Sequence, residues 1–404
     1  MAPTSQTIIA TSRASLTGPG RSAQPAAFVR WGRALGARRI LAAAIALSVA
    51  ALPAAAEELV RVRVASAKTT VSITGKALSL DGRPWSGEAL RASMRGGKLS
   101  IGSRSFRGPV TVSARGSLRL DGRALPGSLR LLPGAGSGID VVNFVPLERY
   151  IASTVASETP ASWPSEALKA QAVVARSYAL HERARRAGEL FDLEGSVISQ
   201  RYAVGSVPES ARAATRETAG LVLVFSGEPI LAAFHSSSGG TTASAAEVWG
   251  EEIAYLRSVS SPDDAAPDYF WSYEITLTDL SAALREAGYS PGRIDDVRIA
   301  ERSRSGRVVA VRAGALELSG RDLREVLGGR ALRSAMFDAR LEGDRVRFLG
   351  SGSGHGVGLC QWGASELARQ GRSYRQILAH YYPGTNLRRI GTPGPVAGHW
   401  SATR

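Results

Sequence analysis

Glu158 is the acidic residue best placed to do chemistry in this 404-residue sequence. Leu147, Ile151 and Val155 recur before it at helical spacing, so we expect a short helix in which Glu158 follows the apolar stripe and is partly buried. Burial, and the negative end of the helix dipole in its last turn, would both raise the pKa of the Glu158 carboxyl group. A carboxylic acid that stays protonated near neutral pH is a suitable general acid. On the residue pattern alone, capping or ion pairing is the commoner role for such a residue.

A second candidate site is the polar segment Phe234–Gly240, which reads FHSSSGG. Its hydroxyl groups and glycine amides are suited to binding a sugar or an oxyanion, and His235 and Ser236 are the candidate binding residues. Their pairing as base and nucleophile is a weaker interpretation, because neighbouring side chains on a strand point to opposite faces. An ordinary serine-rich turn is the alternative.

The third candidate site is the glycine-rich segment Gly354–Gly358, with His355 inside it. Glycines permit positive φ angles and close backbone approach, and the helix expected to follow, with Gln361 and Trp362 in its first turn, presents N-terminal amides. The segment lacks the Lys-Ser/Thr of a phosphate-binding P-loop, and no βαβ pattern supports a dinucleotide site. The alternative is a tight strand-to-helix turn that holds His355 in local hydrogen bonds.

We expect no bound metal and no cofactor. None of His235, His355 and His380 belongs to an H-E-x-x-H motif. Cys360 is the single cysteine, which excludes an internal disulfide and a multi-cysteine zinc site, and we expect it to be a buried packing residue.

Two predicted helices position Glu158. Pro146 is suited to the first helical position and Pro160 blocks continuation of the first helix, while Pro164 opens a second, longer helix. Arg176 and Tyr178 on the second helix are candidates for supporting Glu158 from behind. The stripe that lets the two helices approach closely consists mainly of small residues: Leu168, Ala172, Ala175 and Ala179.

The rest of the chain indicates an α+β fold. Residues 57–142 alternate apolar and polar side chains between turn signals such as Asp81-Gly82 and Asp121-Gly122, which predicts a β-rich N-terminal region. Residues 143–388 mix helical and strand patterns and form the predicted core. Within it, Ser261–Asp268 is acidic and contains proline, so we expect an exposed loop. The Pro/Gly-rich tail, residues 389–404, is expected to be disordered.

The first 56 residues resemble a secretory signal peptide with a long basic leader. Arg38-Arg39 precedes an apolar run from Ile40 to Leu52, which is too short for a membrane span, and small residues ending at Ala56 form a cleavage site. An uncleaved anchor is the alternative. The formal net charge of +15 suits an exported protein that binds an anionic polymer of the cell envelope. No basic stripe with interleaved aromatics supports nucleic-acid binding.

Three passages together resemble the signature blocks of the stage II sporulation protein D family, SpoIID/LytB. They are YIASTVASETPASWPSEALKAQAVVARSYAL, FHSSSGGTTASAAEVWG and GSGHGVGLCQWGASELARQGRSYRQILAHYYPGTNL. The resemblance implies a peptidoglycan lytic transglycosylase that acts on glycan strands stripped of stem peptides, with Glu158 at the family's catalytic position. Glu158 would protonate the bond between N-acetylmuramic acid and N-acetylglucosamine, and the muramic 6-hydroxyl would then attack C1 to give a 1,6-anhydro end. Unlike ordinary glycosidases, this reaction needs one carboxylate.

The same resemblance suggests which residues line a glycan groove, through aromatic faces that stack on sugars and polar groups that bond them. The alternative is a non-catalytic wall-binding modifier that recruits or activates an amidase or works with a membrane partner. The zinc site of some relatives needs Cys and His ligands, which Cys360 alone does not supply. The predicted groove residues are Gln200, Tyr202, His235, Ser236, His355, Gln361 and Trp362.

Overall fold

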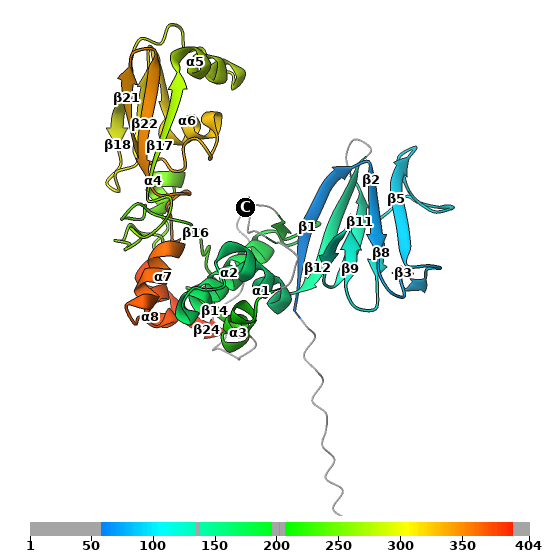
Figure 1. Cartoon of the computed structure of the whole chain (residues 1–404). Coiled ribbons are helices and arrows are strands. Elements are labelled where there is room, and N and C mark those ends of the chain that lie inside the picture. The colour runs from blue at the N-terminus through cyan, green and yellow to red at the C-terminus, as the bar shows by residue number, and fades with distance from the viewer. Residues whose placement is uncertain (1–57, 135–137, 196–201, 203–206, 391–404) are drawn as a thin grey trace, which may run out of the picture. The chain divides into compact units, whose positions relative to one another are not determined.

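The computed structural model describes residues 58–134, 138–195, 202 and 207–390, and Figure 1 shows them as a mixed α+β protein. This confirms the predicted fold class and the β-rich N-terminal region. The predicted signal peptide, Gln200 and nearly all of the predicted tail lie outside the described residues.

The N-terminal region forms two antiparallel assemblies of short strands. One sheet has the order β13-β1-β12-β11-β8-β3-β4, where β13 is Leu193–Glu194 and pairs in parallel with β1, and the other has the order β10-β9-β2-β5-β6-β7. The predicted hairpin turns are confirmed, because Asp81-Gly82 joins β3 to β4 and Asp121-Gly122 joins β9 to β10, each with positive φ angles. The strands are β1 Leu59–Lys68, β2 Thr70–Thr74, β3 Ser79–Leu80, β4 Arg83–Pro84, β5 Ala89–Arg95, β6 Lys98–Ile101, β7 Arg104–Phe106, β8 Val110–Ser113, β9 Leu118–Leu120, β10 Arg123–Leu125, β11 Ser128–Pro133 and β12 Ile139–Pro146.

Strand β12 leads directly into the helix that carries Glu158. It runs through the boundary expected near residue 142, and helix α1, Leu147–Glu158, begins after its N-cap Pro146. Helix α2, Ser165–Arg185, begins after Pro164. The two predicted helices therefore form, and proline at each N-cap removes an N–H that would have no helical partner.

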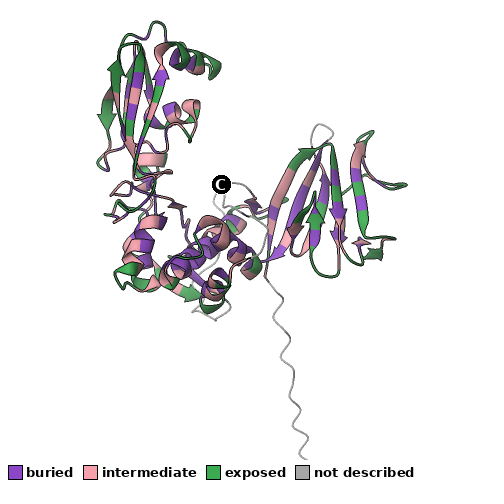
Figure 2. Ribbon diagram, in the orientation of Figure 1, coloured by how far each residue is buried: buried purple, intermediate pink, exposed green. Residues whose placement is uncertain are grey.

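Helix α2 is the most enclosed helix of the core. It contacts α1, α3 (Glu209–Glu217), α7 (Gln361–Arg369) and α8 (Tyr374–Tyr381). Ala172, Ala175 and Ala179 on its predicted small-residue stripe are fully buried, as the purple of Figure 2 indicates along this helix. Small side chains allow several elements to pack on one helix at close range.

A short parallel pair brings two of the candidate segments together. Strand β16, Phe234–His235, pairs in parallel with β23, Leu359–Cys360, so the serine-rich and glycine-rich segments lie side by side. The nearby antiparallel sheet has the order β15-β14-β24, which places a strand at the start of the expected tail. Its strands are β14 Leu221–Phe225, β15 Glu228–Pro229 and β24 Asn386–Arg389.

Residues from β17 to β22 build a separate hydrophobic cluster around Phe348, Val346, Val311 and Leu280. The strand expected over residues 308–318 is wrong as one element, because a turn at Gly314, with φ +60°, divides it into two. The elements are β17 Phe270–Thr276, α5 Leu277–Glu286, β18 Val297–Arg302, β19 Val308–Ala313, β20 Leu316–Ser319, α6 Gly320–Leu327, β21 Phe337–Glu342 and β22 Arg345–Ser351. No helix in the described part of the chain is long and apolar enough to cross a membrane.

Candidate active site

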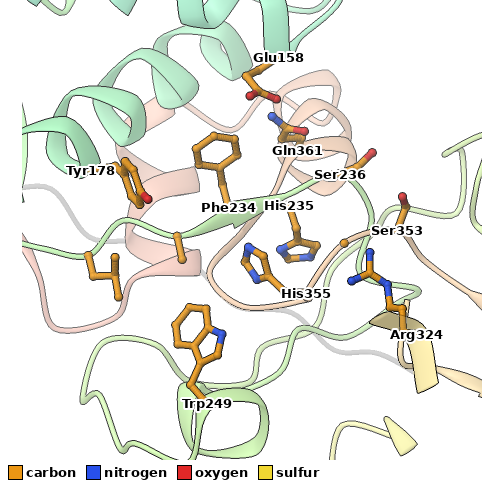
Figure 3. A pocket seen from close by; sticks show the side chains of 13 residues that line it. Glu158, Tyr178, Phe234, His235, Ser236, Trp249, Arg324, Ser353, His355 and Gln361 are labelled. Atoms are coloured by element: carbon orange, nitrogen blue, oxygen red, sulfur yellow. The ribbon is translucent and has the colours of Figure 1, made fainter. Parts of the chain in front are cut away.

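A cavity of about 680 Å³ contains Glu158 and brings the three candidate segments together (Figure 3). Glu158 comes from the end of α1 and Tyr178 from α2, while the glycine-rich turn and the start of α7 supply the opposite strand-to-helix junction. The lining residues are Glu158, Tyr178, Leu231, Ala233, Phe234, His235, Ser236, Trp249, Arg324, Ser353, Gly354, His355 and Gln361.

Glu158 is the only carboxylate among the described residues that line this cavity. It is the last residue of α1 and is half-buried, as its helical position predicts. The next residue, Thr159, closes the helix by donating from both its backbone N–H and its hydroxyl group to the carbonyl of Val155. Glu158 thus stands at the negative end of a fixed helix, and the elevated pKa expected for it stays a prediction.

His235 is held in one tautomer by two hydrogen bonds. Its Nδ1 lies 3.1 Å from the carbonyl oxygen of Val357, which can only accept, so Nδ1 carries the proton. Its Nε2 accepts from the Ser238 hydroxyl at 2.9 Å. Burial, aided by His355 and Arg307, lowers the pKa of His235 well below its ordinary value. The predicted pairing of His235 with Ser236 is therefore wrong, because the ring binds Ser238 instead.

His355 lies beside His235 and is likewise neutral at physiological pH. The two ring centroids are 5.5 Å apart, and Trp249 approaches His355 at 5.6 Å. Nδ1 of His355 accepts from the backbone N–H of Val357 at 3.1 Å, as in the predicted tight turn. Burial lowers the pKa of His355 to about 4. Neither imidazole is therefore a ready proton donor for catalysis near pH 7.

The serine- and glycine-rich loop folds around a carboxylate of the protein itself. Asp263 is 1% exposed and accepts a hydrogen bond of 2.6 Å from the Ser237 hydroxyl group. The loop beyond it was expected to bind a sugar or an oxyanion, and that interpretation is wrong because Asp263 takes these donors. The expectation of an exposed loop at Ser261–Asp268 is wrong for Asp263 as well, since its charge is stabilised by them. The backbone N–H groups that donate to it belong to Ser238, Gly239 and Gly240.

Arg307 holds the carbonyl groups of the same loop. It is 4% exposed, and its Nη1 and Nη2 atoms donate to the carbonyl oxygens of Thr241 and Ser238, each at 3.1 Å. A Cβ atom on Gly356 would lie 2.1 Å from Nη2 of Arg307, so only glycine fits there. Arg307 thereby couples the turn after β18 to the cavity wall.

Gln361 lies in the cavity wall, and two predicted aromatic residues lie elsewhere. Gln361 is 6% exposed, and its amide points toward Gln171 at 3.5 Å. Trp362 does not line this cavity; its ring packs edge-on against Trp163 at 5.1 Å. Tyr202 is 2% exposed, and its hydroxyl group donates to Oδ1 of Asn143 at 2.8 Å. We therefore withdraw Trp362 and Tyr202 from the sugar-stacking set, because both aromatic faces are used in packing.

The two residues expected to support Glu158 behave differently. Arg176 is completely buried and binds Glu148 at the start of α1, ten residues before Glu158. Tyr178 lines the cavity directly. The expectation that Cys360 is a packing residue is confirmed, because it is fully buried and burial raises the pKa of its thiol to about 11.

Several lining residues were not expected from the sequence. Trp249 ends the second quoted passage, and its place there was the available signal. Arg324 and Ser353 carried none, since no motif includes Arg324 and Ser353 lies among glycines. Within the described ranges, no group of three or more His, Cys, Asp or Glu side chains is arranged to hold a metal ion.

The helix pair and glycine-rich turn around one glutamate define a class that comparison with known proteins identifies. Residues 135–225 match the family described as "Stage II sporulation protein", and residues 246–358 match "Domain of unknown function (DUF8618)". The chain belongs to the stage II sporulation protein D family.

Three relatives illustrate this similarity. Stage II sporulation protein D of Bacillus amyloliquefaciens is 33% identical over 264 residues, which cover 61% of this chain and 75% of the relative. An uncharacterized protein of Brachyspira hyodysenteriae is 30% identical over 284 residues, covering 70% and 77%. An amidase enhancer of Bacillus subtilis is 28% identical over 285 residues, covering 58% of this chain and 39% of the relative.

Proposed function

We propose that this protein is a lytic transglycosylase that cleaves the glycan strands of peptidoglycan, with Glu158 as its general acid and base. The observation that carries the proposal is the single carboxylate of the cavity, combined with two histidines held neutral by burial. A hydrolase of the usual kind needs a second carboxylate to activate water or to form a glycosyl intermediate. An intramolecular transfer does not.

The reaction proceeds by two proton transfers through one residue. Glu158 donates its proton to the glycosidic oxygen as the bond from that oxygen to C1 of N-acetylmuramic acid breaks. The 6-hydroxyl of the same muramic ring then forms a bond to C1, and its proton returns to Glu158. The products are a 1,6-anhydromuramic end and a free 4-hydroxyl on N-acetylglucosamine, and no water is consumed.

The walls of the cavity fit an amphiphilic sugar chain. Tyr178 and Trp249 offer aromatic surface, and Trp249 is 37% exposed. Ser236, Ser353 and Gln361 offer polar atoms. Aromatic faces with a few polar groups are the usual composition of sugar-binding sites.

Its proposed place of action is the cell envelope. The predicted signal peptide would export the chain to the periplasm, the wall or the exterior, with an uncleaved anchor as the alternative. Several relatives are named for sporulation, but the substrate argument applies equally to vegetative wall turnover.

A second candidate function is supported by one relative. Because an amidase enhancer is 28% identical to this chain, the protein could instead bind wall glycan and stimulate an amidase without cutting the strand. Glu158 would then have no catalytic duty.

The deciding experiment incubates the purified protein with peptide-free glycan strands and analyses the products by mass spectrometry. We expect anhydromuramic ends from wild type and none from Glu158→Gln. Glu189→Gln, at an exposed glutamate outside the cavity, is the matched control and should be fully active. Reducing ends would indicate a hydrolase. Glycan binding and amidase stimulation without any cleavage would favour the modifier.

A further inference from the structure

Arg324 is the cationic residue of the cavity that the reaction above does not use. It lies in the last turn of α6 and is half-buried. Figure 3 draws its guanidinium group near His355 and Ser353, and its positive charge helps to lower the pKa of His355. A guanidinium group remains protonated at any physiological pH, so the cavity contains a permanent positive charge.

The guanidinium of Arg324 is anchored at one atom and open at the others. Its Nε donates to the carbonyl oxygen of Leu332 at 2.9 Å. None of the ion pairs among the described residues includes Arg324, and no hydrogen bond there involves its Nη atoms. Arg307, by contrast, uses both Nη atoms on loop carbonyls. Arg324 therefore has its two forked nitrogens available for an anion.

The turn that holds Arg324 is bonded directly to the glycine-rich turn. The backbone N–H of Gly354 donates to the carbonyl oxygen of Arg333 at 2.9 Å, and that of Leu332 donates to Gly328 at 3.1 Å. Arg324 binds Leu332, one residue before Arg333. The position of the guanidinium group is thus fixed relative to the cavity wall and does not depend on a free side chain.

We propose that Arg324 binds the free lactyl carboxylate of N-acetylmuramic acid, and so selects strands from which the stem peptide has been removed. This inference rests on the proposed function. The sugar rings are neutral, and the lactyl group is the place where the strand carries a charge. In an intact strand that carboxyl group is an amide bonded to the peptide, so it has no charge for the guanidinium group to pair with and adds bulk beside it.

The proposal also places the reaction after another one. A free lactyl carboxylate is produced when an amidase hydrolyses the bond between the lactyl group and the first amino acid of the stem. The residue that reads this product belongs to the part of the chain that matches a domain of unknown function. That part would supply substrate selection to a site whose acid comes from α1.

The test measures binding without turnover. In a Glu158→Gln background, isothermal titration calorimetry compares a muramic acid-containing tetrasaccharide with the same sugar converted to its lactyl methylamide. We expect the acid to bind roughly 10- to 100-fold more tightly, as for a charge-assisted hydrogen bond. Adding Arg324→Gln should abolish the preference and leave affinity for the methylamide unchanged. Arg324→Lys should retain part of it.

Arg321→Gln, on the same helix but exposed and paired with Glu325, is the matched control and should retain the preference. Equal affinity for the two sugars, or a preference that survives Arg324→Gln in folded protein, overturns the proposal. Cleavage assays separate this from the proposed function. Wild type that cuts acid and methylamide strands equally well would retain the function and exclude the role of Arg324. A preference without any cleavage would do the reverse.

Discussion

Arg176 donates two hydrogen bonds to the carboxylate of Glu148, from Nε at 2.8 Å and from Nη2 at 2.6 Å. The guanidinium group is completely buried on α2, whereas the Glu148 side chain is 40% exposed in the first turn of α1. Glu158 ends that same helix. The pair therefore fixes the start of the helix whose end carries the proposed acid.

Replacing Glu148 by alanine should be strongly destabilising although the side chain is partly exposed. The substitution leaves the buried charge of Arg176 without its counter-ion, which typically costs about 3 kcal/mol or more. We expect the free energy of unfolding from urea titration to fall by that amount. Glu325→Ala removes an exposed pair with Arg321 and should change it by less than about 1 kcal/mol. Equal effects of the two variants would show that the Arg176 pair is not decisive.

The histidine pair predicts a loss of stability in mild acid. The unfolded chain binds protons at histidine near pH 6.5, whereas folded His355 has a pKa of about 4 and folded His235 a pKa well below its ordinary value. Between these limits the unfolded state binds more protons. The free energy of unfolding should thus decrease as pH falls, by up to about 1.4 kcal/mol per pH unit for each histidine.

Urea titrations between pH 7 and pH 5 measure this slope. His355→Gln should reduce the slope, because one histidine no longer gains protons on unfolding. His181→Gln lies outside the histidine pair and serves as the control that retains it. A slope unchanged by His355→Gln would contradict the assignment of the acid sensitivity to this pair.

The local elements of the site could be predicted because their signals are local. Pro146 and Pro164 mark the starts of α1 and α2, and the apolar spacing before Glu158 places that residue at a helix end. The glycines around His355 likewise indicate a tight turn before α7. Such signals depend on residues within a few turns of one another, so sequence spacing is enough to find them.

The rest of the site depends on contacts between distant segments. Arg324 reaches the cavity because the turn at Leu332 and Arg333 is bonded to Gly354, and nothing near Arg324 in the sequence announces it. Asp263 stands in a stretch that reads as an exposed loop, yet its acceptors are filled by residues more than 20 positions earlier. Burial of a charge by a remote nest cannot be inferred from its neighbours in the chain.

Asp263→Asn should weaken the wall of the cavity. The amide group replaces one acceptor oxygen by a donor that faces backbone N–H groups, so buried charge-assisted hydrogen bonds are lost. We expect the free energy of unfolding to fall by roughly 2–4 kcal/mol and the 237–242 loop to be cleaved faster by protease. Asp264→Asn is a matched control, because Asp264 is exposed. A stable, protease-resistant Asp263→Asn protein would show that the carboxylate does not organise the loop.

Gly358 tests how tightly the two candidate segments are held together. A Cβ atom there would lie 2.0 Å from the carbonyl oxygen of Ala233, which accepts hydrogen bonds from the Leu359 N–H at 3.1 Å and the Tyr382 hydroxyl at 2.6 Å. Gly358→Ala must therefore separate β16 from β23 and distort the cavity wall at Ala233. Its φ of +72° adds strain for any residue with a Cβ atom.

Gly343→Ala separates these two costs. Gly343 has a similar φ of +64°, but a Cβ atom there would meet nothing within 4 Å. It should lose about 1 kcal/mol of stability from backbone strain alone, with glycan cleavage unchanged. Gly358→Ala should lose clearly more stability and most of its activity, because the backbone clash cannot be relieved by rotating a side chain. If the two variants were equally stable and equally active, the close approach of β16 and β23 would not be needed to form the site.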